Sequence, residues 1–228
     1  VHPVDGKGVV RLRSLVANAV AGANCPAPRT YFAHYYKRYL QFMDEPAITS
    51  NDIVMLGNSL TEGGGDWGKR LGKDNIINRG ISGDVAMGIY DRLHQILPGK
   101  PKQIFLLIGV NDISHDLSTD SIVQMIEKNV TRIQRESPET KLYLQSLLPI
   151  DESFNRYKKL TNKTYQIPEI NDRLKALAKE KKIDFIDLYP LFTEKGTHVL
   201  RKELTFDGLH LKEEGYKIWV DAIKKKMK

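Results

Sequence analysis

The sequence of 228 residues contains a single cysteine, Cys25, so no disulfide can form within the chain. This excludes the disulfide-stapled miniproteins but leaves the redox compartment open, because secreted proteins can also lack disulfides. No apolar run approaches the ~18 residues that a membrane-spanning helix needs, so no integral membrane segment is expected. Repeats, low-complexity tracts and linkers rich in Gly, Ser or Pro are also absent, and the length favours a single main domain.

The composition is that of an ordinary globular protein, with 41% hydrophobic and 28% charged residues. Four lysines stand among the last five positions, and without them the formal net charge falls from +7 to +3. The tail is therefore interpreted either as a solvated helix end or as a contact for an anionic surface. No nucleic-acid partner is expected, because a binder would more typically carry a basic stripe on a recognisable module.

The first 30 residues are expected to be an extension of the domain formed by residues 31–228. The chain begins Val1-His2-Pro3, which predicts processing or trimming at this end. Arg11 and Arg13 precede a small apolar run at 15–23, which loosely mimics a secretory signal; a short surface helix is the alternative.

An amphipathic helix is predicted over residues 31–44, ending before Pro46. Its aromatic and apolar side chains recur at steps of three and four residues, a stripe more typical of core packing than of a ligand site. The stripe comprises Phe32, Tyr35, Tyr36, Tyr39, Leu40 and Met43.

After residue 50, short apolar runs alternate with amphipathic segments, which predicts an α/β fold with a parallel sheet. The predicted strands are 53–56, 75–78, 104–108, 142–144 and 185–188. The predicted helices are 85–97, 121–136, 167–182 and 213–226, with Thr119 and Asp120 suited to cap the second. Ligands of such sheets bind beyond the carboxyl ends of the strands, so the loops after the strands should carry the chemistry.

Three of these loops contain residues that have both a functional and a purely structural interpretation. Ser59 follows the first strand, where the backbone N–H groups of the turn can stabilise an anion, or where the serine is a simple helix cap. Gly83 follows the second strand, where it permits close backbone approach to a ligand or forms a plain turn. Asn111 follows the third strand and either directs its amide into the cleft or belongs to an Asx turn.

Asp207 and His210 stand three residues apart near the C-terminus. This spacing can place the carboxylate on the imidazole, which a serine nucleophile requires of its base. A metal site uses the same residue types, but a third ligand at motif spacing is missing, so no metal is expected. Of the other histidines, only His115 is expected to line the cleft.

The order Ser…Gly…Asn…Asp-x-x-His across residues 51–223 resembles the SGNH hydrolase superfamily, also called GDSL esterases. The resemblance implies a three-layer α/β sandwich whose five-stranded parallel sheet has the flavodoxin-like order 2-1-3-4-5, with no cofactor. No Gly-x-Ser-x-Gly elbow surrounds Ser59, which disfavours the ordinary α/β-hydrolase fold. The Gly-Asn-Ser block and the residues around His210 look like a branch near platelet-activating-factor acetylhydrolase subunits and bacterial carbohydrate acetylesterases.

The resemblance implies a role for each matching residue. Ser59 is the expected nucleophile and, through its N–H, one oxyanion donor; Gly83 and Asn111 are the other two donors. His210 is the expected general base and Asp207 its orienting carboxylate. Asn58 replaces the usual Asp of the first block, which removes a negative charge beside Ser59 without touching the triad.

These features predict a serine esterase that removes short acyl groups, acetyl first, from a carbohydrate. The cleft residues expected to contact substrate are Glu62, Trp67, Asp84, His115 and Gln145. One alternative is a lysophospholipase or thioesterase acting on small lipid esters, and another is a non-catalytic glycan-binding module. A homodimer and a secreted or periplasmic location are expected, with the cytoplasm as the alternative.

Overall fold

A computed structural model describes residues 29–227, of which those from Ala33 onward belong to one compact unit, Ala33–Lys228. The signal-like segment at residues 11–23 lies outside the described residues. The unit is built on a five-stranded sheet in the order β2-β1-β3-β4-β5, every pair parallel. The strands are β1 Ile53–Gly57, β2 Ile76–Gly80, β3 Gln103–Leu107, β4 Lys141–Gln145 and β5 Asp184–Ile186. The predicted fold class, strand count and strand order are confirmed.

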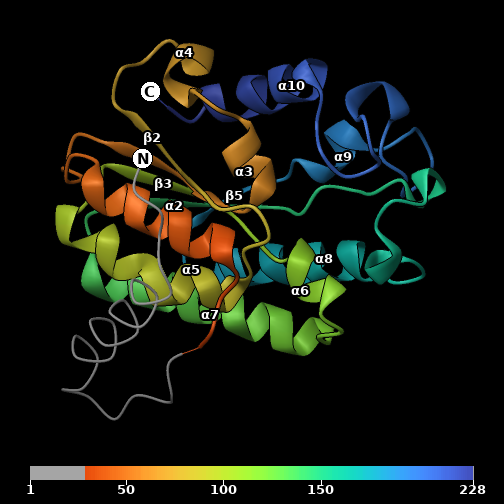
Figure 1. The fold of residues 1–228 in the computed structure, drawn as a ribbon, viewed down its shortest axis with the longest axis horizontal. Coiled ribbons are helices and arrows are strands. Elements are labelled where there is room, and N and C mark those ends of the chain that lie inside the picture. The colour runs from red at the N-terminus through yellow and green to blue at the C-terminus, as the bar shows by residue number, and fades with distance from the viewer. Residues whose placement is uncertain (1–28, 228) are drawn as a thin grey trace. The chain divides into compact units, whose positions relative to one another are not determined.

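Helices cover both faces of this sheet, which explains why the central strands are continuous apolar runs. The helices are α2 Ala33–Asp44, α3 Ser59–Gly63, α4 Trp67–Leu71, α5 Ala86–Arg92, α6 Val110–Ser114, α7 Thr119–Glu136, α8 Gln166–Glu180, α9 Tyr189–Phe192 and α10 Glu213–Lys224. Alternate side chains of one strand enter different cores: Leu106 packs on the side of α5, α7 and α8, and Phe105 on the side of α4 and α10 (Figure 1).

Helix α5 and the cap of α7 differ most from the prediction, whereas the ends of the other predicted helices are shifted by at most two residues. Helix α5 ends at Arg92, and the rest of the predicted segment forms two 3₁₀ turns, Leu93–Gln95 and Leu97–Gly99. Pro98 explains the change, because proline cannot donate within a helix and disfavours helical geometry at the residue before it. The cap of α7 is Ser118, whose hydroxyl accepts a hydrogen bond from the N–H of Ser121, rather than Thr119 or Asp120.

Helix α2 forms where it is predicted, but only part of the predicted aromatic and apolar stripe is buried. Tyr35 and Phe42 are its buried residues, seven positions or two turns apart, whereas Leu40 and Met43 are 40% and 63% exposed. The hydroxyl of Tyr35 donates to the carbonyl of Gly88 at 3.0 Å, which anchors α2 on α5.

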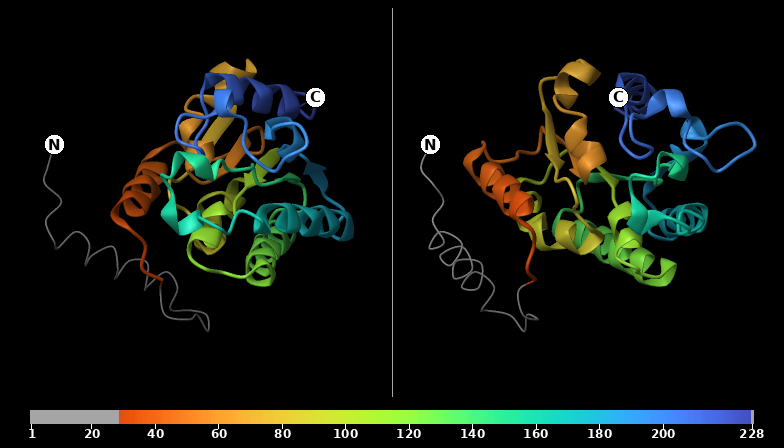
Figure 2. Two further views of the ribbon diagram at one scale, coloured as in Figure 1. Left: turned by 90° about the vertical axis from the view of Figure 1, so that its right-hand side faces the viewer. Right: turned by 45° about the vertical axis from the view of Figure 1, so that its right-hand side comes forward.

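The carboxyl ends of the strands open onto one edge, where several connections converge. In both views of Figure 2 the segment between β4 and α8 lies beside the loop that precedes α10. A backbone hydrogen bond from Asp151 N–H to Gly208 O, at 2.9 Å, joins these two segments. Within residues 29–227, no helix has the length and apolar character needed to cross a bilayer.

Candidate active site

Ser59 is the first residue of α3, directly beyond the end of β1. The side-chain oxygen of Asn58 caps this helix by accepting from the N–H of Leu60 at 3.1 Å. The amide oxygen of Asn58 therefore caps the helix as the carboxylate of an aspartate would, but without a negative charge. As the first helical residue, Ser59 has a backbone N–H with no partner inside the helix.

His210 and Asp207 meet in the tight turn before α10. The Oδ1 atom of Asp207 accepts from the backbone N–H groups of Leu209 and His210, at 3.0 and 2.7 Å. Its Oδ2 atom lies 2.8 Å from Nδ1 of His210, as the three-residue spacing predicts. Gly208 has φ +91°, and a Cβ there would lie 2.3 Å from the carbonyl oxygen of Asp151, so only glycine fits this turn.

The imidazole connects this turn to the serine. Nε2 of His210 lies 2.9 Å from Oγ of Ser59, so the hydroxyl can donate its proton to the ring. Burial alone raises the pKa of the Asp207 carboxyl, but hydrogen bonds from Tyr157, His210 and two backbone N–H groups outweigh it and hold that pKa below its usual value. Asp207 therefore remains an anion able to stabilise an imidazolium.

The loops after β2 and β3 bring the two further predicted donors to the same edge. The strand register pairs Gly57 with Gly80 and with Leu107, so both loops start level with Ser59. Gly83 is exposed in a turn with φ +82°. The side-chain amide of Asn111 donates one proton to the carbonyl of Asp84 at 2.8 Å, which leaves its second proton for a ligand.

Asp84 does not line the site, so its predicted contact with substrate is wrong. Its carboxylate is fully buried and accepts from Nε of Arg92 at 2.9 Å. The same guanidinium donates from Nη2 to the carbonyl oxygens of Gly57 and Arg79, at 3.1 and 2.9 Å. Burial raises the pKa of Asp84 to about 6, against the lowering effect of Arg92. The buried pair fixes the ends of β1 and β2 and the loop that carries Gly83.

Glu62 is half-buried and braces the same loop from the other side. One carboxylate oxygen accepts from the backbone N–H and, at 2.7 Å, from the hydroxyl of Ser82. From α2, Nε2 of His34 lies 3.0 Å from the carboxylate and Nε of Arg38 lies 3.4 Å from it. Burial raises the pKa of Glu62, but the hydrogen bonds from Ser82 and His34 lower it by more. The pKa of this carboxyl is therefore below its usual value.

Trp67 and Gln145 lie in the core, so their predicted substrate contacts are also wrong. Each is only 1% exposed. Trp67 packs edge-to-face on Trp219 and donates from its indole N–H to the carbonyl of Thr61 at 2.9 Å. The side-chain oxygen of Gln145 accepts from the indole of Trp219 at 2.7 Å. His115 is exposed just after α6, four positions beyond Asn111, and remains a candidate contact.

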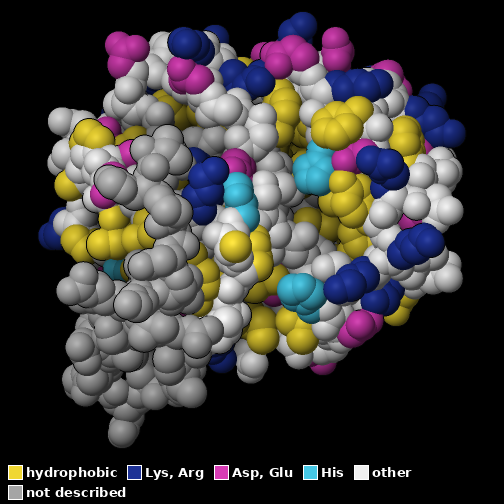
Figure 3. Space-filling view, viewed as in Figure 1, with side chains coloured by type: hydrophobic (Ala, Val, Ile, Leu, Met, Phe, Trp, Pro, Cys, Tyr) yellow, Lys and Arg dark blue, Asp and Glu magenta, His cyan; other side chains and the backbone are white. Residues whose placement is uncertain are grey.

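Two aromatic residues that the sequence analysis missed flank His210. The hydroxyl of Tyr157 lies 2.8 Å from Nδ1 of His210. The ring of Phe206 is 61% exposed and stacks nearly parallel on the imidazole, with centroids 6.0 Å apart. Phe206 adjoins Asp207 in sequence, a signal that was available, whereas no pattern connects Tyr157 with a turn 50 residues away. Figure 3 shows histidine and apolar side chains around a hollow on this face of the molecule.

Neither a metal cluster nor a cofactor is expected from the sequence. Among residues 29–227, no three His, Cys, Asp or Glu side chains are placed to hold one ion.

The chain was compared with known families and proteins. Residues 55–218 match the model of the GDSL-like lipase/acylhydrolase family. A curated relative, an N-acylneuraminate cytidylyltransferase of Escherichia coli, is 24% identical over 184 residues; the match covers 76% of this chain and 39% of the relative. The chain thus spans well under half the length of that relative.

Two solved structures share the fold. A GDSL-like lipase from Bacteroides thetaiotaomicron is 25% identical with a TM-score of 0.75, the match covering 86% of this chain and 98% of the other. An acetyl xylan esterase, AlAXEase, is 22% identical with a TM-score of 0.64, covering 78% and 100% of the two chains.

Proposed function

Because the chain belongs to the GDSL-like lipase/acylhydrolase family and is a carboxylic ester hydrolase, we propose that it removes short acyl groups, acetyl first, from carbohydrate esters. The observation that carries the proposal is the continuous line of contacts from Ser59 Oγ to His210 Nε2 and from His210 Nδ1 to Asp207 Oδ2, at 2.9 and 2.8 Å. These are the contacts that an acyl-transferring serine, its base and the orienting carboxylate require.

In the proposed reaction, His210 takes the proton of Ser59 while Oγ attacks the ester carbonyl carbon. The tetrahedral intermediate collapses when the protonated imidazole gives its proton to the leaving alcohol oxygen, which leaves the acyl group on Oγ. Water then repeats the cycle: it loses a proton to His210, attacks the acyl carbon and releases a carboxylic acid and free Ser59.

The developing oxyanion is assigned to the N–H groups of Ser59 and Gly83 and to the free amide proton of Asn111. Their support is positional, since each follows the end of one of three adjacent strands. Donors fixed before the reaction need no reorganisation in the transition state, so the buried Arg92–Asp84 pair beneath these loops contributes indirectly.

The acetyl-carbohydrate specificity rests on two observations. A structural neighbour is named as an acetyl xylan esterase, which acts on an acetylated glycan. The exposed ring of Phe206 lies beside His210, and a flat aromatic face is a suitable surface for the apolar face of a sugar.

The test is hydrolysis of p-nitrophenyl acetate, butyrate and octanoate by the wild type and by Ser59→Ala, followed by release of acetate from acetylated xylo-oligosaccharides. We expect turnover of acetate that falls with chain length and is lost in the variant. Faster turnover of octanoate would replace the carbohydrate proposal with a lipid ester. Glycan binding that survives Ser59→Ala, with no turnover by the wild type, would favour a binding module.

The proposal extends to a homodimer and to a secreted or periplasmic location, both from the resemblance to acetylhydrolases and carbohydrate acetylesterases. Gel filtration of the purified protein and fractionation of the producing cells test these two points separately.

A further inference from the structure

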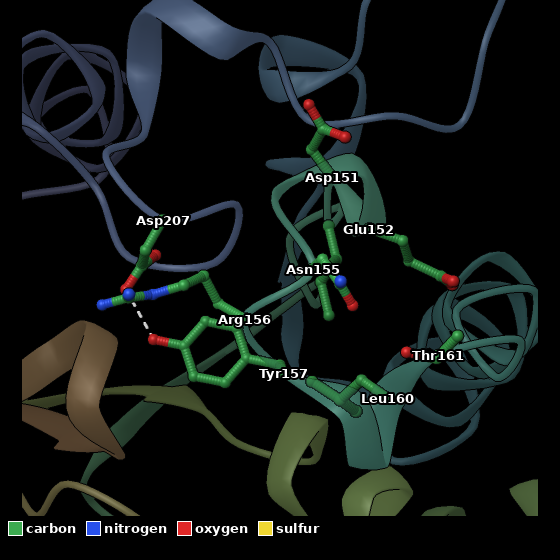
Figure 4. A pocket seen from close by; sticks show the side chains of 9 residues that line it. Asp151, Glu152, Asn155, Arg156, Tyr157, Leu160, Thr161 and Asp207 are labelled. Atoms are coloured by element: carbon green, nitrogen blue, oxygen red, sulfur yellow. Dashed lines mark hydrogen bonds between the residues drawn. The ribbon is translucent and has the colours of Figure 1, made fainter.

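Tyr157 reaches the triad from a part of the chain that carries none of the family's motifs. It lies between β4 and α8 and directly precedes the 3₁₀ turn Lys158–Leu160. Figure 4 shows its ring directed toward the turn that carries Asp207, with the hydroxyl bonded to that carboxylate.

Three polar atoms form a closed triangle at this point. The hydroxyl of Tyr157 donates to Oδ2 of Asp207 and lies 2.8 Å from Nδ1 of His210, while Nδ1 lies 2.8 Å from the same Oδ2. Because Nε2 must accept from Ser59, the ring proton of the neutral imidazole is on Nδ1. Oδ2 therefore accepts two hydrogen bonds, one from the phenol and one from the imidazole N–H.

The phenol remains a donor at neutral pH. Burial, the hydrogen bond to Asp207 and the charge of that carboxylate all raise the pKa of Tyr157, and the opposing charge of Arg156 is weaker. The charged or titratable groups that act on the hydroxyl are Asp207, His210 and Arg156, and the carboxylates of Asp151 and Glu152 line the same pocket.

The segment that carries Tyr157 is fixed on both sides of the tyrosine. Before it, Asp151 N–H donates to Gly208 O in the Asp207 turn, at 2.9 Å. After it, Leu160 is buried in the core, and Lys163 and Thr164 bond to Asp116 and Glu152. The hydroxyl is therefore held at the triad by the fold rather than by chance rotation of a free side chain.

We propose that Tyr157 is a positioning residue of the triad, which locks the Asp207 carboxylate and shares it with the imidazole of His210. The inference rests on the proposed esterase function and adds a fourth residue to its site. Sharing has an electrostatic consequence. The hydrogen bond from the phenol reduces the negative charge that Asp207 presents to His210, so the carboxylate stabilises the imidazolium less.

Tyr157→Phe removes only the hydroxyl and tests this directly. Without the competing donor, Asp207 interacts more strongly with protonated His210, so the acid limb of the kcat/KM profile moves to higher pH. Loss of the lock lowers kcat for p-nitrophenyl acetate about 10-fold, with little change in KM. Tyr165→Phe is the matched control, because Tyr165 lies on the same segment and is 70% exposed.

A kcat and an acid limb equal to those of the wild type in Tyr157→Phe would overturn the proposal. A lower kcat with an unmoved acid limb would also overturn it, since a purely structural role predicts that result. A second readout is independent of turnover: the titration of the His210 ring, followed by NMR, moves to higher pH in Tyr157→Phe. If the wild type hydrolyses no ester, the esterase proposal fails, while an unmoved ring titration rejects the role of Tyr157 by itself.

Discussion

Ser59 and His210 are 151 positions apart in the sequence, yet Oγ of one lies 2.9 Å from Nε2 of the other. Ser59 is placed by the end of β1, and His210 by the Asx turn of Asp207 before α10. Tyr216 of α10 donates from its hydroxyl to the carbonyl of Leu60 at 2.9 Å, which ties the two elements together. The contact thus depends on rigid secondary structure on both sides, as a preorganised catalytic pair requires.

Asp207→Asn keeps the shape of the orienting side chain and removes its charge. We expect kcat to fall about 10³–10⁴-fold, because an amide stabilises neither the required tautomer nor the imidazolium. Steady-state hydrolysis of p-nitrophenyl acetate measures it. Asp187→Asn, an exposed aspartate beyond β5, is the control and keeps the wild-type rate. A loss below 10-fold would contradict the triad assignment.

Asn111→Ala removes one assigned oxyanion donor and should lower kcat about 10²–10³-fold. The variant also loses the hydrogen bond to Asp84 O, so KM and the melting temperature are measured with kcat. Asn51→Ala, exposed before β1, provides the comparison. Wild-type turnover by a folded Asn111→Ala protein would remove Asn111 from the mechanism.

The sequence was most informative where local chemistry and topology act together. Apolar runs such as residues 104–108 predict buried parallel strands, and parallel strands bring their following loops to one edge. That reasoning, with the family resemblance, was enough to bring Ser59 and His210 to one site. The spacing within each motif, such as the three residues from Asp207 to His210, is local, so the contacts inside the turn follow from the sequence itself.

Side-chain direction on short elements could not be predicted in the same way. Helix α4 has five residues, too few for a hydrophobic period, so the inward orientation of Trp67 depends on contacts with α10. Asp84 looked like a cleft residue because its partner, Arg92, lies on the next helix with no sequence signal for pairing. Tyr157 is brought to the triad by an irregular segment whose path only tertiary packing determines.

Glu62→Ala removes the acceptor that holds Ser82, the residue before Gly83. Hydrogen bonds to a charged group are worth about 1.5–3 kcal/mol, so loosening this loop should lower kcat about 10–100-fold. Glu62→Gln keeps one acceptor oxygen and should lose less. Glu203→Ala, which removes an exposed ion pair with Arg201, controls for loss of surface charge. Equal kcat values for Glu62→Ala and Glu203→Ala would contradict a bracing role.

Asp112 should make stability depend on pH. Burial raises the pKa of its carboxyl to about 7, although a hydrogen bond from Ala86 N–H lowers it. In the unfolded chain an aspartate titrates near pH ~3.9, so between these values the folded state binds more protons. The stability that this proton provides is present at pH 4 and lost as the pH rises through 7.

Asp112→Asn removes this dependence while keeping an acceptor for Ala86. The free energy of unfolding of the variant, minus that of the wild type, should therefore increase between pH 4 and 8. Urea denaturation at several pH values measures the difference. If the difference in the free energy of unfolding stays constant across this range, Asp112 does not titrate between pH 4 and 8.

We expect substitutions of Phe206 and Trp67 to have opposite effects: the first should change substrate binding and the second should change stability. Phe206→Ala truncates a side chain that is 61% exposed and should change stability by less than about 0.5 kcal/mol. If its face supports a sugar, KM for an acetylated xylo-oligosaccharide rises about 3–10-fold, while KM for p-nitrophenyl acetate, which carries no sugar, changes less.

Trp67→Phe acts in the reverse sense, because the indole is 1% exposed and packs on Trp219. Its loss of volume and of the hydrogen bond to Thr61 O should lower the free energy of unfolding by about 1–3 kcal/mol. KM for the xylo-oligosaccharide should stay at the wild-type value, since no substrate reaches that ring. A raised KM in Trp67→Phe with unchanged stability would restore Trp67 to the cleft and remove the reason for assigning the sugar-facing surface to Phe206.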